Sequence, residues 1–151
     1  MPSTPIDSGL FRDMFGTPAM RGVFSDEALL GRYAEAEAAL ARAEAKVGVI
    51  PGEAAEAISA AIGRGLSFDM ERMKRETENV GYPILPLVHQ LADAAGDAGR
   101  YVHWGATTQD IMDTATVLQL RAALDLVAED IGALRGILAG LAAEHRDTPM
   151  A

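Results

Sequence analysis

Cysteine is absent from the 151 residues, and aromatic residues make up only 5% of them. The lack of cysteine excludes disulfides and thiolate metal sites and fits a reducing compartment. The 13 Lys and Arg residues are outnumbered by 22 Asp and Glu residues, which gives a formal net charge of −9. Nucleic acids and anionic membrane surfaces need a basic face, so neither is expected as a partner. The sequence shows no signal-peptide pattern and no apolar run of membrane-spanning length, so we expect a soluble cytoplasmic protein.

What the chain does contain favours an all-α fold. Hydrophobic residues amount to 49% and suffice for a substantial core. Gly and Pro divide the sequence into helical segments after an irregular arm over residues 1–23. The predicted helices run from Ser25 to about Lys46, Gly52 to Ile62, about Asp69 to Glu78, Pro83 to just before Gly96, and Thr108 to about Glu144.

The first predicted helix has apolar residues at intervals of three and four. These residues predict one buried face and a Glu/Arg-rich solvent face: Leu29, Tyr33, Ala36, Leu40 and Ala43. We therefore interpret the acidic residues between positions 35 and 56 as solvated.

The last predicted helix carries a heptad seam for more than three repeats. The seam consists of Val117, Leu120, Leu124, Val127, Ile131, Leu134, Leu138 and Leu141. A seam of this kind needs a partner. The helix would be about 50 Å long, and the short helices before it cannot bury it. We expect it to associate with other parts of the same chain or with other subunits.

The start of this helix is a candidate carboxylate site. Thr107 can act as N-cap, and Asp110, three residues later, can complete a capping box. A helix N-terminus offers unpaired N–H donors and a partial positive charge, so an anion could meet Thr107, Thr108 and Gln109 without a cationic side chain. The alternative is an ordinary cap that binds nothing.

Three segments in order resemble the fumarase/aspartase superfamily. The segment from His103 to Thr114, which reads HWGATTQDIMDT, is similar to the first signature region of that superfamily. Residues 24–51 resemble the first helix of the branch that holds adenylosuccinate lyase and 3-carboxy-cis,cis-muconate cycloisomerase. Residues 81–88, GYPILPLV, resemble a segment of the cycloisomerases.

The resemblance implies a fold and an assembly. It implies a short-helix N-terminal domain, residues 1–105, that leads into the first long helix of a central helical bundle, residues 106–151. Members assemble as homotetramers whose active sites draw residues from three subunits. Residues 148–151 resemble the start of a second signature, so we expect an N-terminal portion whose catalytic acid and base lie beyond Ala151.

The resemblance also implies a substrate class. Residues 14–20 lack the phosphate ligands typical of adenylosuccinate lyases, and residues 77–80, TENV, lack the histidine of those enzymes. The implied reaction is therefore the lactonisation of 3-carboxy-cis,cis-muconate or a similar small polycarboxylate, in the catabolism of aromatic acids. It needs no metal and no organic cofactor. Thr107 and Thr108 would bind a substrate carboxylate, supported by Gln109, and Asn79 would hydrogen-bond the substrate.

The remaining candidate residues receive structural interpretations. His103 is expected to orient groups that touch the substrate, and Trp104 to pack under the helix start. His89 is expected to be solvated, and nothing in the sequence defines the surroundings of His145. The three histidines are too far apart in sequence for a metal site. Arg21 is a possible carboxylate ligand, with an ion pair to Asp26 as the alternative.

Two other functions stay open. One is a superfamily lyase that releases fumarate by β-elimination of a C–N or C–O bond, as adenylosuccinate lyase does. The other is a non-enzymatic helical module that uses only the heptad seam for self-association, in which Thr107 and Thr108 could be replaced freely.

Overall fold

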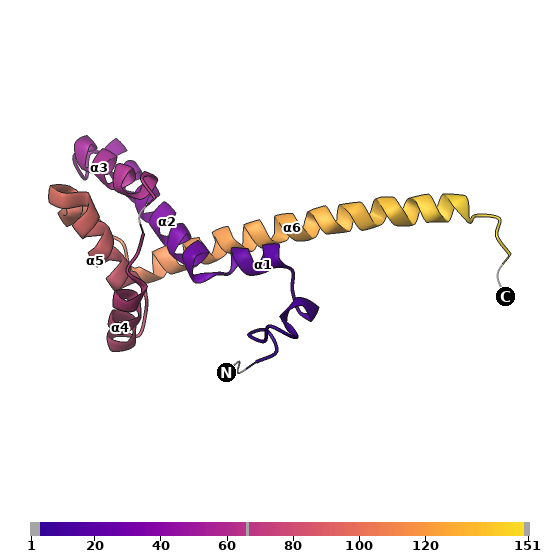
Figure 1. Ribbon diagram of the computed structural model, residues 1–151. Coiled ribbons are helices and arrows are strands. Elements are labelled where there is room, and N and C mark those ends of the chain that lie inside the picture. The colour runs from indigo at the N-terminus through magenta and orange to yellow at the C-terminus, as the bar shows by residue number, and fades with distance from the viewer. Residues whose placement is uncertain (1–3, 66, 150–151) are drawn as a thin grey trace. The chain divides into compact units, whose positions relative to one another are not determined.

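The computed structural model describes residues 4–65 and 67–149, which form six α-helices, two short 3-10 helices and no strand (Figure 1). The elements in chain order are η1 (Arg12–Met14), α1 (Pro18–Val23), α2 (Asp26–Lys46), α3 (Gly52–Gly63), α4 (Met70–Val80), α5 (Ile84–Ala95), η2 (Gly96–Tyr101) and α6 (Thr108–Glu144). The all-α prediction is confirmed for this part of the chain, including a long helix that begins at Thr108 and ends at Glu144.

The helix ends follow local chemical signals. The Ser25 hydroxyl accepts a hydrogen bond from the Ala28 N–H at 3.2 Å, and Asp69 Oδ1 accepts one from the Arg72 N–H at 3.0 Å. Both contacts satisfy donors that the first turn of a helix leaves free. Helix α4 ends at Gly81, whose φ of 86° lies in the left-handed region that glycine adopts without strain.

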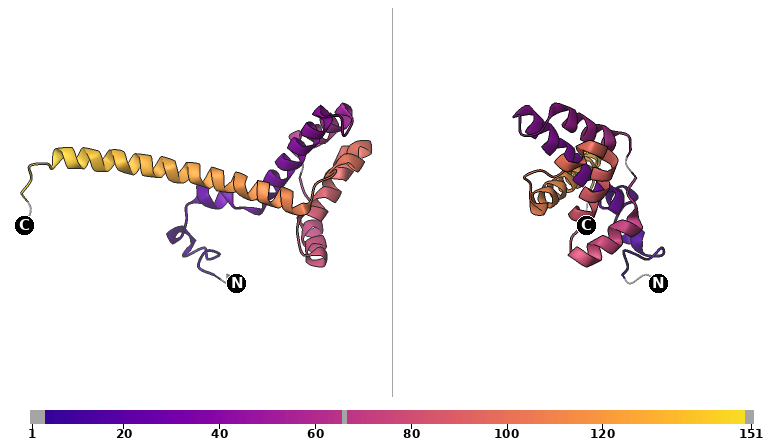
Figure 2. Two further views of the ribbon diagram at one scale, coloured as in Figure 1. Left: turned by 180° about the vertical axis from the view of Figure 1, so that it is seen from behind. Right: turned by 90° about the vertical axis from the view of Figure 1, so that its left-hand side faces the viewer.

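The chain forms two compact units. One is Ser25–Gln119, and the other combines Met1–Phe24 with Leu120–Ala151. In the first unit α2 packs against α3 and α5, and α5 also contacts α3, α4 and η2. Figure 2 shows α2 and α3 running alongside each other. The predicted division between residues 105 and 106 stays a prediction.

Two apolar clusters hold the first unit together. One centres on Ile58 of α3 and Leu91 of α5 and joins them to α2 and η2. The other places Ile84 and Leu87 of α5 against Leu30 of α2, Met73 of α4 and Ile111 of α6. The second cluster therefore fixes the first turns of α6, which carry the candidate carboxylate site.

The buried face of α2 differs from the predicted one. Tyr33 and Ala36 are buried as predicted, but Leu29 and Leu40 are only half-buried and Ala43 is exposed. Helix α2 is covered by more than one neighbour, so its buried arc is wider than a single stripe. The wider arc also takes in Leu30, Ala34, Glu37, Ala38 and Ala41.

The predicted seam of α6 is uncovered. Its eight residues are exposed by between 40% for Val127 and 64% for Leu124. A Cβ added to Gly132, Gly136 or Gly140 would meet nothing within 4 Å, so no described segment packs on these glycines.

Among the described residues, no helix is both long enough and apolar enough to cross a membrane.

Candidate functional site

The start of α6 has the predicted capping box. Asp110 Oδ2 accepts hydrogen bonds from the N–H of Thr107 at 2.9 Å and from its hydroxyl at 2.8 Å. In return, the Asp110 N–H lies 3.4 Å from the Thr107 hydroxyl. The backbone N–H and then the hydroxyl of Thr107 hold the pKa of Asp110 below its ordinary value, and the nearby charge of His103 adds to this effect.

This arrangement assigns different roles to the three predicted carboxylate ligands. Both Thr107 donors are used by Asp110, so an anion that binds Thr107 must displace that carboxylate. The Gln109 amide donates to Asp113 Oδ1 at 2.5 Å, one turn further along the helix. Thr108 occupies the first position of α6 and is half-buried. Of the three side chains, only that of Thr108 has no hydrogen-bond partner among the described residues.

Among the described residues, the structure does not join Asn79 to these donors by a hydrogen bond. Asn79 is exposed in the last turn of α4. Its proposed contact with substrate stays a prediction.

Beside the helix start, His103 is held by a buried glutamate. His103 Nδ1 lies 2.6 Å from Glu37 Oε1, and the exposed fractions of the two side chains are 17% and 1%. The two residues are 66 positions apart in the sequence. His103 also has a φ of 61°, in the left-handed region that few residues other than glycine adopt. The acidic residues of α2 are therefore not all solvated, and the prediction for Glu37 was wrong.

Burial dominates the electrostatics of Glu37. It raises the pKa of the carboxyl group, while the hydrogen bond and the charge of His103 lower it and the charge of Glu44 raises it. Burial also raises the pKa of Glu44. Glu37 Oε2 and Glu44 Oε2 are buried and have no hydrogen-bond partner among the described residues.

The sequence contained a signal for Glu37 that the face assignment missed. Glu37 lies four residues after Tyr33 and four before Ala41, and both of these residues are buried. A glutamate in register with an apolar stripe indicates a buried partner, but spacing alone could not identify that partner as His103.

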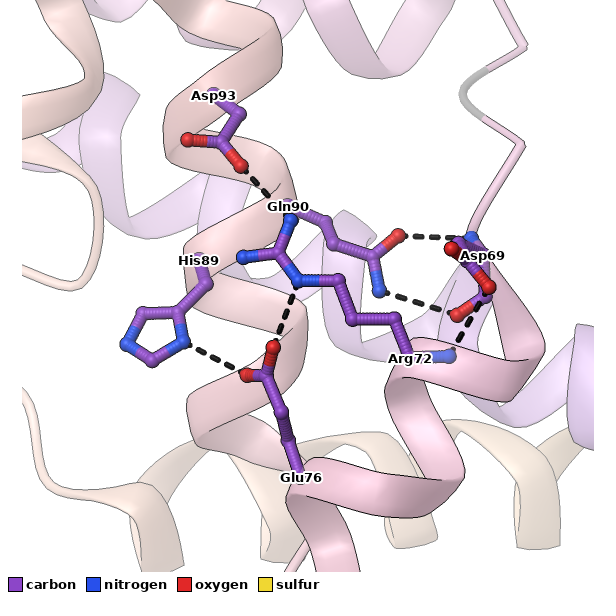
Figure 3. A network of polar contacts seen from close by, with 6 residues as sticks. All are labelled: Asp69, Arg72, Glu76, His89, Gln90 and Asp93. Atoms are coloured by element: carbon purple, nitrogen blue, oxygen red, sulfur yellow. Dashed lines mark hydrogen bonds and ion pairs between the residues drawn. The ribbon is translucent and has the colours of Figure 1, made fainter.

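A second polar network links α4 to α5 (Figure 3). Arg72 donates to Glu76 Oε1 at 2.7 Å and to Asp93 Oδ2 at 2.9 Å, and His89 Nδ1 lies 2.8 Å from Glu76 Oε2. His89 was expected to be solvated, and its side chain is 46% exposed; it also pairs with Glu76. Both contacts lower the pKa of Glu76, with Arg72 contributing most.

Two further predictions are corrected. Trp104 is 52% exposed and contacts the Tyr101 ring at a centroid distance of 6.4 Å, so it does not pack under the helix start. Arg21 binds Asp13 Oδ1 at 2.6 Å and the Gly16 carbonyl at 2.7 Å rather than Asp26. A guanidinium already held within its own segment is a poor candidate for a free carboxylate ligand. His145 is exposed, with Nδ1 3.4 Å from the Thr148 hydroxyl.

Comparison with known proteins places the chain in a family. The family described as Lyase matches residues 14–151, so the chain belongs to this family of the fumarase/aspartase superfamily. It is 44% identical to trans-aconitate decarboxylase 1 of Mycosarcoma maydis over 100% of this chain and 31% of that protein. It is 46% identical to 3-carboxy-cis,cis-muconate cycloisomerase of Pseudomonas putida over 93% of this chain and 34% of that protein.

A solved structure agrees with the fold. The crystal structure of fumarate lyase from Mesorhizobium sp. BNC1 matches with a TM-score of 0.84 and 57% identity, over 87% of this chain and 31% of that one. Other relatives include N-acetyl-S-(2-succino)cysteine lyases and an adenylosuccinate lyase. The chain spans about a third of the length of the relatives it matches.

Proposed function

We propose that the chain supplies the carboxylate-binding corner of an enzyme that lactonises 3-carboxy-cis,cis-muconate or a similar small polycarboxylate. The observation that carries this proposal is the start of α6, where Thr108 occupies the first helical position and His103 lies within electrostatic range of Asp110. In a chain with a net charge of −9, an anionic substrate must be held by such local donors.

The proposed reaction adds a substrate carboxylate oxygen to one carbon of a neighbouring double bond. A proton is added to the other carbon, which lies beside a second carboxylate. Negative charge develops on that second carboxylate before the proton transfer is complete. Hydrogen-bond donors directed at this carboxylate stabilise the transition state. Thr108 is the proposed direct ligand, while Thr107 and Gln109 become ligands when Asp110 and Asp113 release them. The reaction calls for no metal or organic cofactor, and the proton donor lies outside the described residues.

Two relatives support a small polycarboxylate as substrate. The compounds in their names, trans-aconitate and 3-carboxy-cis,cis-muconate, are both tricarboxylates without a phosphate. The N-acetyl-S-(2-succino)cysteine lyases, at 40% and 41% identity, favour a second candidate, which is elimination of fumarate from a succinyl compound. Both candidates need a carboxylate held at the start of α6, and they differ in the bond that is broken or formed.

The exposed seam supports assembly as part of the same proposal. Eight apolar residues along one face of α6 are 40–64% exposed, and a seam of this length is stabilised by other helices. We propose a homotetramer with a central bundle in which residues 106–151 take part. We use the term assembled enzyme for this chain together with the helices that cover the seam.

Product analysis distinguishes the candidates. The assembled enzyme is incubated separately with 3-carboxy-cis,cis-muconate and with a succinyl amine or thioether, and the products are identified by NMR. We expect a lactone from the first compound and no fumarate from the second. Fumarate without lactone would overturn the lactonase proposal in favour of the second candidate. No conversion of either compound would contradict both and favour the non-enzymatic self-association module.

A matched pair of variants connects the product to the site. Thr108→Val removes the hydroxyl at the helix start and is expected to reduce turnover at least about tenfold, as for a lost hydrogen bond to a charged group. Thr116→Val removes an exposed hydroxyl that donates to the Met112 carbonyl two turns further along α6, and it should leave turnover unchanged. Equal activities of the two variants would show that the helix start does not bind the substrate.

A further inference from the structure

We propose that Glu37 is a positioning residue that fixes the imidazole of His103 with Nδ1–H pointing inward, so that Nε2 is the nitrogen that meets a substrate carboxylate. The identity of the ligand rests on the proposed function, whereas the orientation and tautomer of His103 do not.

The geometry leaves His103 little freedom. The contact of 2.6 Å between Nδ1 and Oε1 joins a loop residue to the middle of α2, where the glutamate side chain is 1% exposed. The left-handed backbone of His103, with φ at 61°, costs energy in any residue with a Cβ. A residue held in such a conformation by a buried hydrogen bond has one preferred position rather than several.

The contact with Glu37 decides which tautomer the imidazole ring of His103 adopts. A neutral histidine ring carries one proton, on either Nδ1 or Nε2. The hydrogen bonds that these two nitrogens make decide which of them is protonated. An ionised Glu37 only accepts, so Nδ1 must carry the proton. Nε2 is then an acceptor when the ring is neutral and a donor when it is protonated. Pairs of this kind orient the imidazoles of metal and catalytic sites.

Glu37 is difficult to explain as a purely structural residue. It lies in an apolar stripe with Tyr33 and Ala41, and its Oε2 is buried without a hydrogen-bond partner among the described residues. An apolar side chain of similar size would fill the same place without the cost of burying a carboxylate. Burial also raises the pKa of Glu37, which means that the ionised carboxylate is less stable at this position than in water.

The surroundings of His103 indicate a carboxylate as ligand. Residues 101–119 contain no Lys or Arg, so His103 is the only side chain in that segment that can carry a positive charge. Its charge lowers the pKa of Asp110, which places His103 within electrostatic range of the start of α6. The charged groups that interact with it are the carboxyl groups of Glu37 on α2 and Asp110 on α6. A protonated Nε2 would therefore complement the Thr108 hydroxyl in binding a substrate carboxylate.

The first test is the tautomer of His103, read from the NMR signals of its ring nitrogens at a pH where the ring is neutral. We expect the Nδ1–H form in the native chain. The Nε2–H form in the native chain would overturn the proposal by itself, because it would mean that Glu37 is the protonated partner and donates to Nδ1.

A variant and a matched control extend this test. Glu37→Leu removes the acceptor, and the spectrum should change to a mixture in which the Nε2–H form dominates, as in free imidazole side chains. Glu35→Leu removes an exposed glutamate of the same helix that pairs with Arg32, and the His103 spectrum should not change. An unchanged spectrum in Glu37→Leu would contradict the proposal. If Glu37→Leu fails to fold, the tautomer of His103 in the native chain still decides whether the proposal is correct.

The second test uses substrate. In the assembled enzyme Glu37→Leu should raise KM for the polycarboxylate by at least about tenfold, the size expected for a weakened hydrogen bond to a charged group, while Glu35→Leu should leave KM unchanged. An unchanged KM in Glu37→Leu would refute the role in binding. If the enzyme converts no polycarboxylate, the proposed function fails, but the tautomer measurement still tests the positioning of His103 independently.

Discussion

The side-chain amide of Gln90 pairs with both backbone polar groups of Asp69. Gln90 Oε1 accepts the Asp69 N–H at 2.7 Å, and Gln90 Nε2 donates to the Asp69 carbonyl at 3.2 Å (Figure 3). Gln90 is only 8% exposed, and Asp69 is the N-cap of α4. The buried amide of α5 therefore fixes the point at which α4 begins.

Replacement of Gln90 by Leu should destabilise the first unit. The substitution leaves the N–H and the carbonyl of Asp69 without their partner, and we expect the free energy of unfolding to fall by about 2 kcal/mol. Chemical denaturation measures this difference. Gln109→Leu, which removes an exposed amide bound to Asp113, is the matched control and should cost much less. Equal losses in the two variants would show that the Gln90 contacts contribute little.

Acid should weaken the α4–α5 network in a predictable window. The pKa of Glu76 is lowered from its ordinary value of 4.5, first by Arg72 and then by His89. A lowered pKa in the folded state stabilises the fold above the ordinary value, and this contribution is lost as the pH falls through the folded-state pKa. The stabilities of the native chain and Glu76→Gln should therefore differ at neutral pH and converge in acid. Glu78→Gln alters an exposed residue of the same helix and is the control. Curves for the native chain and Glu76→Gln that stay parallel at every pH would contradict the shift.

Two glycine-to-alanine substitutions should have opposite effects. A Cβ at Gly99 would lie 2.9 Å from the carbonyl carbon of Ala92 and closer still to its oxygen. Gly99→Ala must therefore move η2 away from α5, at a cost of about 1–3 kcal/mol. Gly132→Ala, inside α6 with nothing within 4 Å, should stabilise its helix by up to about 1 kcal/mol. Thermal unfolding of both variants checks the prediction, which fails if Gly99→Ala melts at or above the native temperature.

The seam should control association without controlling the fold of Ser25–Gln119. Leu134→Glu places a charge in the apolar seam and should weaken self-association at least about tenfold, because a buried charge has no partner there. Ala133→Glu changes an exposed position outside the predicted seam and should have little effect. Sedimentation measures the assembly and circular dichroism the helix content. Unchanged assembly in Leu134→Glu would show that the seam is not the interface.

Thr107 should contribute to both stability and function. Thr107→Val removes the hydroxyl that donates to Asp110, and loss of an N-cap side chain costs about 1 kcal/mol. We also expect turnover in the assembled enzyme to fall strongly, since the hydroxyl belongs to the proposed carboxylate site. Near-normal turnover with reduced stability would limit Thr107 to the role of a cap.

Much of the fold could be predicted because its signals are local. Ser25, Asp69 and Thr107 mark helix starts through bonds that span only a few residues. The glycines after α4 and α5 mark helix ends through their positive φ. The periodicity of α6 likewise defined its length and its uncovered seam.

The interior of the first unit could not be predicted in the same way. The burial of Glu37 depends on His103, 66 positions away, and the buried role of Gln90 depends on the loop before α4. The ion pair of His89 depends on how α5 lies along α4. Such contacts join residues that share no local pattern, so a solvated face was the simpler prediction for Glu37, and it was wrong there.

The proposed function requires that a small polycarboxylate binds at the start of α6. It is tested most directly by amide NMR spectra of the chain during titration with tricarballylate, a small tricarboxylate. We expect saturable shifts of the Thr108 and Gln109 amides and of the His103 ring, and we expect these shifts to be lost in Thr108→Val but not in Thr116→Val. Amides at the start of α6 that stay unmoved, or shifts that appear only elsewhere, would contradict it.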